Sequence, residues 1–175
     1  MIVLKTGLLE LREMTLDDLA DLHAVFSDPI AMRYYPQPFT RKMTTSWIEW
    51  NLRNYKQYGF GLWAVIHIED KRLIGDCGLT IQRVDGIDEL EIGYHILRSY
   101  WGQGLATRGA MACRDYAFDK LKSERVISWM NPANTASRRV AEKAGMHLEK
   151  ETFDSRGKPA VVYAMTPADR RLQGA

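Results

Sequence analysis

The sequence predicts an α+β domain in which helices cover a central sheet. Segments with alternating or continuous apolar residues are interleaved with segments whose apolar residues recur every three or four positions. Their order is strand, two helices, three strands, helix, strand, helix and two strands, which favours a layered arrangement. The length of 175 residues and the hydrophobic content of 46% suit a single globular domain.

The chain is predicted to open with one strand and one helix. The strand covers Leu8–Arg12, where apolar and charged residues alternate. Thr15 is a favourable N-cap for a helix over Leu16–Phe26, and the Asp28-Pro29 pair ends that helix.

A loop with two prolines and three aromatic residues follows at Met32–Phe39. It has two interpretations. Its rings could cover an edge of the core, or they could line a cleft that binds an acceptor substrate, since amphipathic rings can hold a ligand while their hydroxyls stay hydrated. Tyr34 and Tyr35 are the substrate-binding candidates under the second interpretation.

The next segments are predicted as a helix and a hairpin. The helix covers Met43–Gln57, and its Trp47 and Trp50 are more typical of a core than of a ligand site. The hairpin strands cover Leu62–Ile68 and Arg72–Ile81, with a polar turn between them.

The stretch Glu89–Leu121 is the centre of the predicted fold. Glu91–Ile96 is compatible with a strand, Gly102–Gly104 with a turn, and a helix is expected from Leu105 onward. A glycine-rich turn that enters a helix presents backbone N–H groups without helical partners, and the helix dipole adds to their attraction for an anion. A side chain at either glycine would hold a phosphate away from the backbone. The turn therefore predicts a phosphate site.

The remainder is predicted as a strand, a helix and a closing hairpin. Pro132 is expected in the first helical position, and Gly145 ends that helix. We expect one domain over residues 1–166 and a polar, frayed tail over residues 167–175. The predicted elements are a strand at Arg125–Met130, a helix from Asn131 to Ala144, and strands at Met146–Thr152 and Val161–Thr166.

Several ligands could use the glycine turn. A nucleoside triphosphate loop needs a lysine, which Gly102–Thr107 lacks. A dinucleotide fold needs a third glycine, where Thr107 stands, and an acid at the end of the next strand, which instead ends at Met130-Asn131. The third possible ligand is the pyrophosphate of coenzyme A. The ordinary alternative is a tight turn without a ligand.

Composition excludes other classes of protein. The formal net charge of +2, without a run of basic residues, does not indicate a nucleic-acid partner. No apolar run approaches the roughly 20 residues that span a bilayer, and the first residues do not resemble a secretion signal. Cys77 and Cys113 lie in apolar contexts and are predicted to be free buried thiols, which fits the cytoplasm. No Cys/His cluster suggests a metal.

The segment Tyr100–Thr107, YWGQGLAT, resembles the coenzyme A loop of the GNAT acetyltransferases, whose pattern is Gln/Arg-x-x-Gly-x-Gly/Ala. Trp101 stands where Gln or Arg is usual, which is typical of the RimJ/RimL-like branch that acetylates protein N-termini. The element order also matches over nearly the full length. The resemblance implies a three-layer α/β/α fold with a mixed, mostly antiparallel sheet whose splayed centre binds acetyl-CoA.

A second motif, beginning at Asn134, resembles the family's Asn-x-x-Ser/Ala signature. Asn134 and Ser137 share a helix face, and by resemblance Asn134 hydrogen-bonds the pantetheine arm. Asn134 could instead only satisfy local backbone groups. Many members carry a tyrosine, at the position of Ala141, that protonates the leaving thiolate. By resemblance to the RimL-like branch, Ser137 takes that role here.

Direct acetyl transfer to an amine requires a base near the central strand. Glu91 and His95 lie four apart and face one side of a regular strand, although the family's strand is bulged, which would break this parity. Glu91 is the first candidate and His95 the second. A backbone N–H around Ile96–Arg98 is expected to stabilise the charge on the carbonyl oxygen. The expected cofactor-binding residues are Ile96, Leu97, Arg98, Gly102, Gln103, Gly104, Ala106, Thr107, Asn134 and Ser137.

The sequence thus predicts a cytoplasmic acetyl-CoA-dependent N-acetyltransferase that works by direct attack in a ternary complex. The acceptor could be a protein N-terminal amine, favoured by branch, or a polyamine, an amino acid or an aminoglycoside. The alternative from another class is a non-catalytic acyl-CoA sensor. The expected partners are acetyl-CoA and an amine acceptor, without nucleic acid, membrane or metal; a homodimer is compatible with this reading.

Overall fold

The computed structural model describes residues 1–173, which form one mixed sheet of eight strands and the helices that cover it. The strand order is β1-β2-β3-β4-β5-β6-β8-β7. The strands are β1 (Ile2–Lys5), β2 (Leu9–Arg12), β3 (Leu62–His67), β4 (Arg72–Val84), β5 (Ile87–Ile96), β6 (Val126–Met130), β7 (His147–Phe153) and β8 (Pro159–Met165). The helices are α1 (Leu19–Phe26), α2 (Arg41–Tyr58), α3 (Leu105–Asp119), α4 (Thr135–Lys143) and α5 (Pro167–Gln173), with 3-10 turns at Leu16–Asp18 and Arg98–Tyr100.

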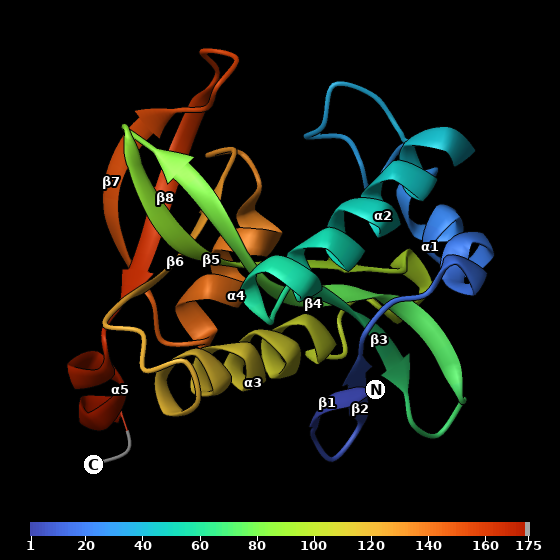
Figure 1. The fold of residues 1–175 in the computed structure, drawn as a ribbon. Coiled ribbons are helices and arrows are strands. Elements are labelled where there is room, and N and C mark those ends of the chain that lie inside the picture. Colours follow the sequence, from blue (N-terminus) through green and yellow to red (C-terminus); the bar gives the residue numbers. More distant parts are fainter. Residues whose placement is uncertain (174–175) are drawn as a thin grey trace.

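The helices lie on both faces of the sheet, so the molecule has three layers (Figure 1). Helix α3 crosses one face and packs with α4, and α1 and α2 lie on the opposite face. Each face has its own apolar core: Cys113 of α3 joins the first, and Phe26 of α1 joins the second. The predicted α+β class and three-layer arrangement are confirmed.

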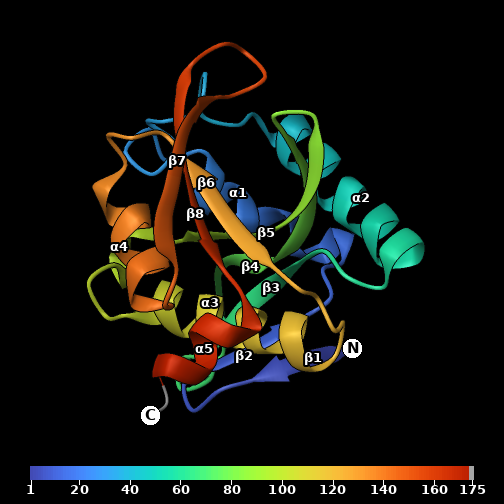
Figure 2. The same cartoon turned by 90° about the vertical axis from the view of Figure 1, so that its left-hand side faces the viewer.

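The sheet divides between β5 and β6. These two strands are parallel and pair at a single position, Glu91 with Ile127, whereas β4 and β5 pair continuously from Gly75–Ile96 to Val84–Ile87. Strands β6, β8 and β7 therefore form a separate wing of the sheet (Figure 2). This seam is the predicted splayed centre. The bulge expected in the central strand is absent from the β4–β5 ladder, which shows no register shift.

Local signals explain most of the element boundaries. Thr15 and Asp18 form a capping box, and the Thr40 hydroxyl accepts from the Met43 N–H at the start of α2. Gly59 ends α2 with a φ of +78°, a left-handed conformation that favours glycine.

Three differences from the sequence prediction go beyond shifts of a few residues at the ends of elements. Strand β1 was not predicted; it pairs with β2 at the sheet edge. Helix α4 begins at Thr135 rather than at Pro132, because the Asn131 side chain accepts from Ala133 N–H and turns the chain first. Residues 167–173 form α5 rather than a frayed segment, since Arg170 pairs with Asp119 of α3 at 2.7 Å. The last two residues of the predicted tail lie outside the described residues.

The two cysteines are free and buried, as predicted, with their Sγ atoms 3.6 Å apart between β4 and α3. Among the described residues, no helix is long and apolar enough to cross a membrane.

Candidate functional site

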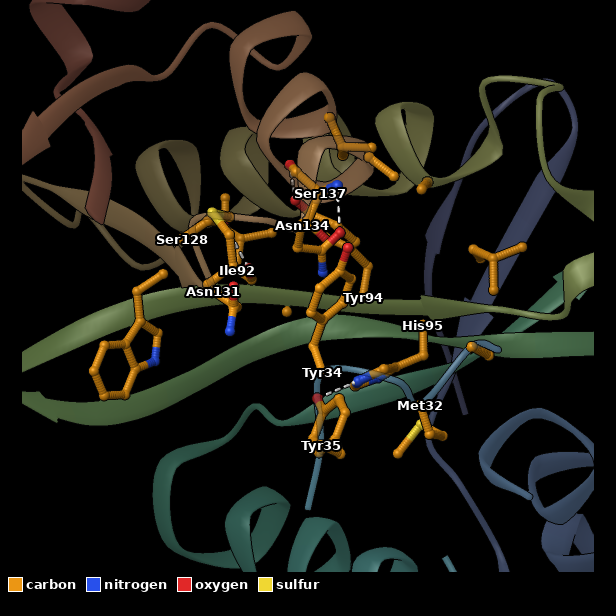
Figure 3. Close-up of a pocket in the computed structure, with 18 of the residues that line it drawn as sticks. Met32, Tyr34, Tyr35, Ile92, Tyr94, His95, Ser128, Asn131, Asn134 and Ser137 are labelled. Carbon is orange, nitrogen blue, oxygen red and sulfur yellow. Dashed lines mark hydrogen bonds between the residues drawn. The ribbon is translucent and has the colours of Figure 1, made fainter. Parts of the chain in front are cut away.

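A cavity of about 800 Å³ opens along the seam between β5 and β6 and collects most of the predicted site residues (Figure 3). Its walls come from the α1–α2 loop, β5, the glycine turn, α4 and the β7–β8 turn. The predicted residues that line it are Tyr34, Tyr35, Glu91, His95, Ile96, Gly102, Gly104, Ala106, Thr107, Asn134 and Ser137. Leu97, Arg98 and Gln103 are not among its lining residues, and the Arg98 guanidinium instead pairs with Asp28 at 2.7 Å.

The glycine turn at one end of the cavity has the geometry of an anion cradle. Gly102 and Gly104 have φ angles of +78° and +74°, and no atom lies within 4 Å of the place where a Cβ at either would stand. Gly104 is the N-cap of α3, so the N–H groups of the first turn point out of the helix toward that open space. The turn therefore fits a diphosphate, which needs backbone donors and room beside them.

Along β5, the backbone N–H and C=O groups of every second residue point toward the seam. The Ile92 carbonyl accepts from the Ser128 hydroxyl of β6 at 2.7 Å, and the Ile96 carbonyl accepts from the Trp101 indole at 2.6 Å. Leu97 N–H donates in the other direction, to the Ile74 carbonyl of β4. By this alternation the N–H groups of Tyr94 and Ile96 face the seam, where an extended amide-containing arm can add as a strand. The sequence predicts that a backbone N–H around Ile96–Arg98 stabilises the charge on the carbonyl oxygen. Of these groups, Leu97 N–H is already bonded to β4, whereas Ile96 N–H faces the cavity.

The first turn of α4 is fixed on both sides of Ser137. Its N–H donates to Asn134 Oδ1 at 3.1 Å, and its carbonyl accepts from the Tyr94 hydroxyl at 2.9 Å. Asn134 is therefore the N-cap of α4, and its Oδ1 is used by the helix. The amide Nδ2 is the group of Asn134 that can donate to a ligand carbonyl.

Glu91 is held by the residue directly opposite it in the sheet. Thr80 is its cross-strand partner on β4, and the Thr80 hydroxyl donates to Glu91 Oε2 at 3.1 Å. Burial of the carboxyl raises the pKa of Glu91 to about 7, although the Thr80 hydrogen bond and the nearby His95 act in the opposite direction. A carboxyl with this pKa can exchange a proton at neutral pH.

His95 is also held by its cross-strand partner. Asp76 lies opposite it on β4, fully buried, and its Oδ1 lies 2.7 Å from His95 Nδ1. On the cavity side, His95 Nε2 lies 2.6 Å from the Tyr35 hydroxyl, and both residues line the cavity (Figure 3). The regular β4–β5 register therefore explains why Glu91 and His95 face the same cavity.

The aromatic loop between α1 and α2 forms the wall opposite α4. The Tyr34 hydroxyl donates to the Ala133 carbonyl, 2.8 Å away at the approach to α4, and so links the two sides of the seam. Trp47 and Trp50 of α2 both line the cavity, and Trp47 also packs in the second apolar core, so Trp47 belongs to core and cavity at once.

Sequence reasoning missed three residues of the site: Asp76, Thr80 and Tyr94. Asp76 carried a usable signal, because a single acid inside the apolar run of a strand must have a buried partner. Thr80 and Tyr94 carried none, since both residue types are ordinary in strands. Within the described residues, no group of three or more His, Cys, Asp or Glu side chains could hold a metal ion.

The chain is similar in sequence and in fold to known acetyltransferases. The profile of the acetyltransferase (GNAT) domain matches residues 9–147. The chain is 40% identical over 164 residues to the uncharacterized protein YkkB of Bacillus subtilis (strain 168), across 91% of this chain and 93% of YkkB. It is 35% identical over 129 residues to the probable N-acetyltransferase YjcK of the same organism, across 74% of this chain and 69% of YjcK.

Among solved structures, RimL, a ribosomal alpha-N-protein acetyltransferase in complex with coenzyme A, has a similar fold. The TM-score is 0.77 at 19% sequence identity, across 95% of this chain and 98% of that chain.

Proposed function

The chain belongs to the GNAT acetyltransferase family, and on that premise we propose that it moves an acetyl group from acetyl-CoA to the α-amine of a protein N-terminus. The acetyl-CoA-dependent N-acetyltransferase class predicted from sequence is confirmed by this membership. The observation that carries the proposal is one continuous cavity that joins the glycine turn to Glu91.

The donor side of the cavity would bind acetyl-CoA through three features. The N–H groups that follow Gly104 would hold the diphosphate, the β5 edge near Tyr94 would pair with the pantetheine amides, and Asn134 Nδ2 would donate to a pantetheine carbonyl. When bound, acetyl-CoA supplies an activated acyl group on a thiol that leaves as a stable anion near neutral pH. Ile96 N–H, on the same edge of β5, would donate to the acetyl carbonyl oxygen.

The acceptor side would receive the amine between the aromatic loop and β5. An α-amine has a pKa of about 8, so it must lose a proton before it attacks. Glu91 is the group that takes this proton, because its pKa of about 7 leaves the carboxylate form available at neutral pH. His95 is the second candidate; it lines the cavity, but its Nε2 is already hydrogen-bonded to the Tyr35 hydroxyl.

An N-terminal amine is favoured over a small molecule by two observations. The likeness to RimL in fold supports the RimJ/RimL-like branch, which the tryptophan at Trp101 also indicates. The aromatic loop and the β7–β8 turn both line the cavity and stand at the same end of the molecule in both views (Figures 1 and 2). A peptide that continues beyond its first residue could contact both segments.

A panel of acceptors with acetyl-CoA tests this function. We expect thiol release and a 42 Da mass gain with short peptides that carry a free α-amine, and a lower kcat/KM with polyamines, amino acids and aminoglycosides. Peptides with a blocked N-terminus and an internal lysine are the matched control. Preference for a small amine would contradict the N-terminal acceptor, and tight acetyl-CoA binding without any turnover would favour the non-catalytic sensor that Ala141 leaves open.

Ser137→Ala is expected to lower kcat about tenfold without a change in acetyl-CoA affinity, because a weak donor to the leaving thiolate contributes modestly. Ser137→Cys keeps a donor at the same place and should recover part of the loss. Steady-state kinetics and calorimetry measure the two quantities. Wild-type turnover by Ser137→Ala would remove the hydroxyl from the mechanism.

A further inference from the structure

A chain of hydrogen bonds runs from the buried side of the sheet to the acceptor end of the cavity. It joins Trp47 of α2, Asp76 of β4, His95 of β5 and Tyr35 of the aromatic loop. Trp47 Nε1 lies 2.8 Å from Asp76 Oδ2, Asp76 Oδ1 lies 2.7 Å from His95 Nδ1, and His95 Nε2 lies 2.6 Å from the Tyr35 hydroxyl.

The donors and acceptors of this chain can be assigned from its buried end. An indole N–H can only donate, so Asp76 Oδ2 accepts from Trp47. Asp76 is fully buried, and a carboxylate in that position requires donors at its oxygens. His95 Nδ1 therefore carries a hydrogen and donates to Oδ1. In the neutral ring, Nε2 is then the acceptor, and the Tyr35 hydroxyl must donate to it.

The consequence appears at the cavity surface. When the Tyr35 hydroxyl donates its hydrogen to His95, its oxygen can only accept hydrogen bonds from a molecule in the cavity. The pKa of Tyr35 is raised well above its usual value by burial and by the nearby Glu91 and Asp76, so the hydroxyl keeps its proton. The Tyr35 oxygen and the ionised form of the Glu91 carboxyl then both accept hydrogen bonds at the cavity surface.

We propose that Asp76 is a positioning residue that acts through His95 to aim the Tyr35 oxygen as a hydrogen-bond acceptor for the incoming amine. This role rests on the proposed function, and it adds a determinant of specificity to it. A primary amine has several N–H bonds, so it can satisfy Glu91 and Tyr35 together. The rings of Phe26 and Trp47 meet the His95 imidazole edge-on, at 5.2 and 5.9 Å between centroids, and hold its plane.

Charged groups reach this array from several elements. Asp76 faces His95 from β4, Glu91 lies on the same strand as His95, and Arg156 of the β7–β8 turn acts on Tyr35 from across the cavity. Of the groups in this series of hydrogen bonds, only Asp76 contacts His95 from the buried side. A substitution at Asp76 can therefore reverse the direction of the hydrogen bonds without replacing a side chain that lines the cavity.

Asp76→Asn is the test, because the amide has nearly the shape of the carboxylate. Its oxygen can accept from Trp47, and its NH₂ would then donate to His95 Nδ1. The ring hydrogen would move to Nε2, and the Tyr35 hydroxyl would turn its own hydrogen to the cavity. We expect kcat/KM for the best peptide of the acceptor panel to fall roughly 10- to 100-fold, mainly through KM, with unchanged acetyl-CoA affinity.

Nitrogen-15 NMR of the histidine rings gives a reading that does not depend on activity. The chain has only four histidines. In its neutral form, the wild-type His95 ring should carry its hydrogen on Nδ1, and the Asp76→Asn ring should carry it on Nε2. The matched control is Asp70→Asn, which alters the other His–Asp pair, where His67 Nδ1 lies 3.0 Å from Asp70 outside the cavity lining. That variant should leave the His95 tautomer unchanged.

Tyr35→Phe tests the other end of the chain and avoids a buried substitution. It should lower amine kcat/KM by a similar factor while His95 keeps its hydrogen on Nδ1. Wild-type His95 with its hydrogen on Nε2 would overturn the proposal, and so would unchanged amine kcat/KM in Tyr35→Phe. If the wild-type protein acetylated no amine at all, the proposed function would fail instead, so the two failures can be told apart.

Discussion

Gly104→Val is expected to lower the affinity for acetyl-CoA by at least about 10²-fold. The added side chain would occupy the open space beside the first turn of α3, where the structure has no atom within 4 Å of the Cβ position. Each hydrogen bond between an N–H and a charged phosphate contributes about 1.5–3 kcal/mol, and loss of two would give a factor of this size. Isothermal titration with acetyl-CoA measures it.

Gly86→Val is the matched control for this substitution. Gly86 lies in the turn between β4 and β5 with a φ of +83°, close to the +74° of Gly104, and it also has no atom within 4 Å of its Cβ position. Both variants therefore carry the same backbone strain, and only one of them fills the cradle. Equal affinity in Gly104→Val and wild type would defeat the assignment of this turn to the diphosphate.

Glu91→Gln is expected to lower kcat roughly 10²- to 10³-fold at pH 8, which is the usual range for loss of a general base. In the wild-type protein, kcat should rise as the pH passes through about 7, because the carboxylate is the active form. The variant should lack this rise. Glu89→Gln is the matched control: Glu89 lies two residues earlier on β5, pairs with Arg125 at 3.1 Å, and is not among the cavity-lining residues.

Glu91→Gln should also change the free energy of unfolding, by an amount that depends on pH. The pKa of Glu91 is raised from 4.5 to about 7 on folding, so its contribution to stability is fully present below pH 4.5 and is lost as the pH rises through 7. Glu91→Gln should therefore be more stable than the wild type at pH 8, by about 1–3 kcal/mol, and the difference should shrink toward pH 5. Urea unfolding at the two pH values measures it.

A wild-type kcat that is flat from pH 6 to 8 would contradict the kinetic prediction that Glu91 is the base.

Periodicity and capping residues predicted most of the elements. The helix over Arg41–Tyr58 and the paired strands of β3 and β4 follow from apolar spacing and from the glycine at Gly59. Strand β1 was missed because four residues at the chain start carry too short a pattern, and its pairing with β2 decides its state. Helix α5 was missed because its main anchor, the pairing of its Arg170 with Asp119 of α3, joins residues far apart in the sequence.

The residues of the candidate site also fall into those that local sequence motifs predict and those that depend on long-range packing. The glycine turn and Asn134 could be predicted because their function lies in local backbone geometry that short motifs record. The partnership of Asp76 with His95 could not, because it depends on the register between β4 and β5, and a shift by one residue would place Asp76 on the other face. Tyr94 was missed for a related reason: its hydroxyl meets α4 only after the seam has formed.

The single ladder position that joins β5 to β6 also bears on the thermal stability of the protein. Away from that position, the two wings of the sheet are held across the seam mainly by side chains, such as the Ser128 hydroxyl on Ile92 and the Tyr94 hydroxyl on Ser137. A cosubstrate arm laid between the wings would act as a strand shared by both, so a protein saturated with its donor should resist unfolding more than the empty one. The concentration of acetyl-CoA would then set the stability of the enzyme against unfolding as well as its rate of turnover.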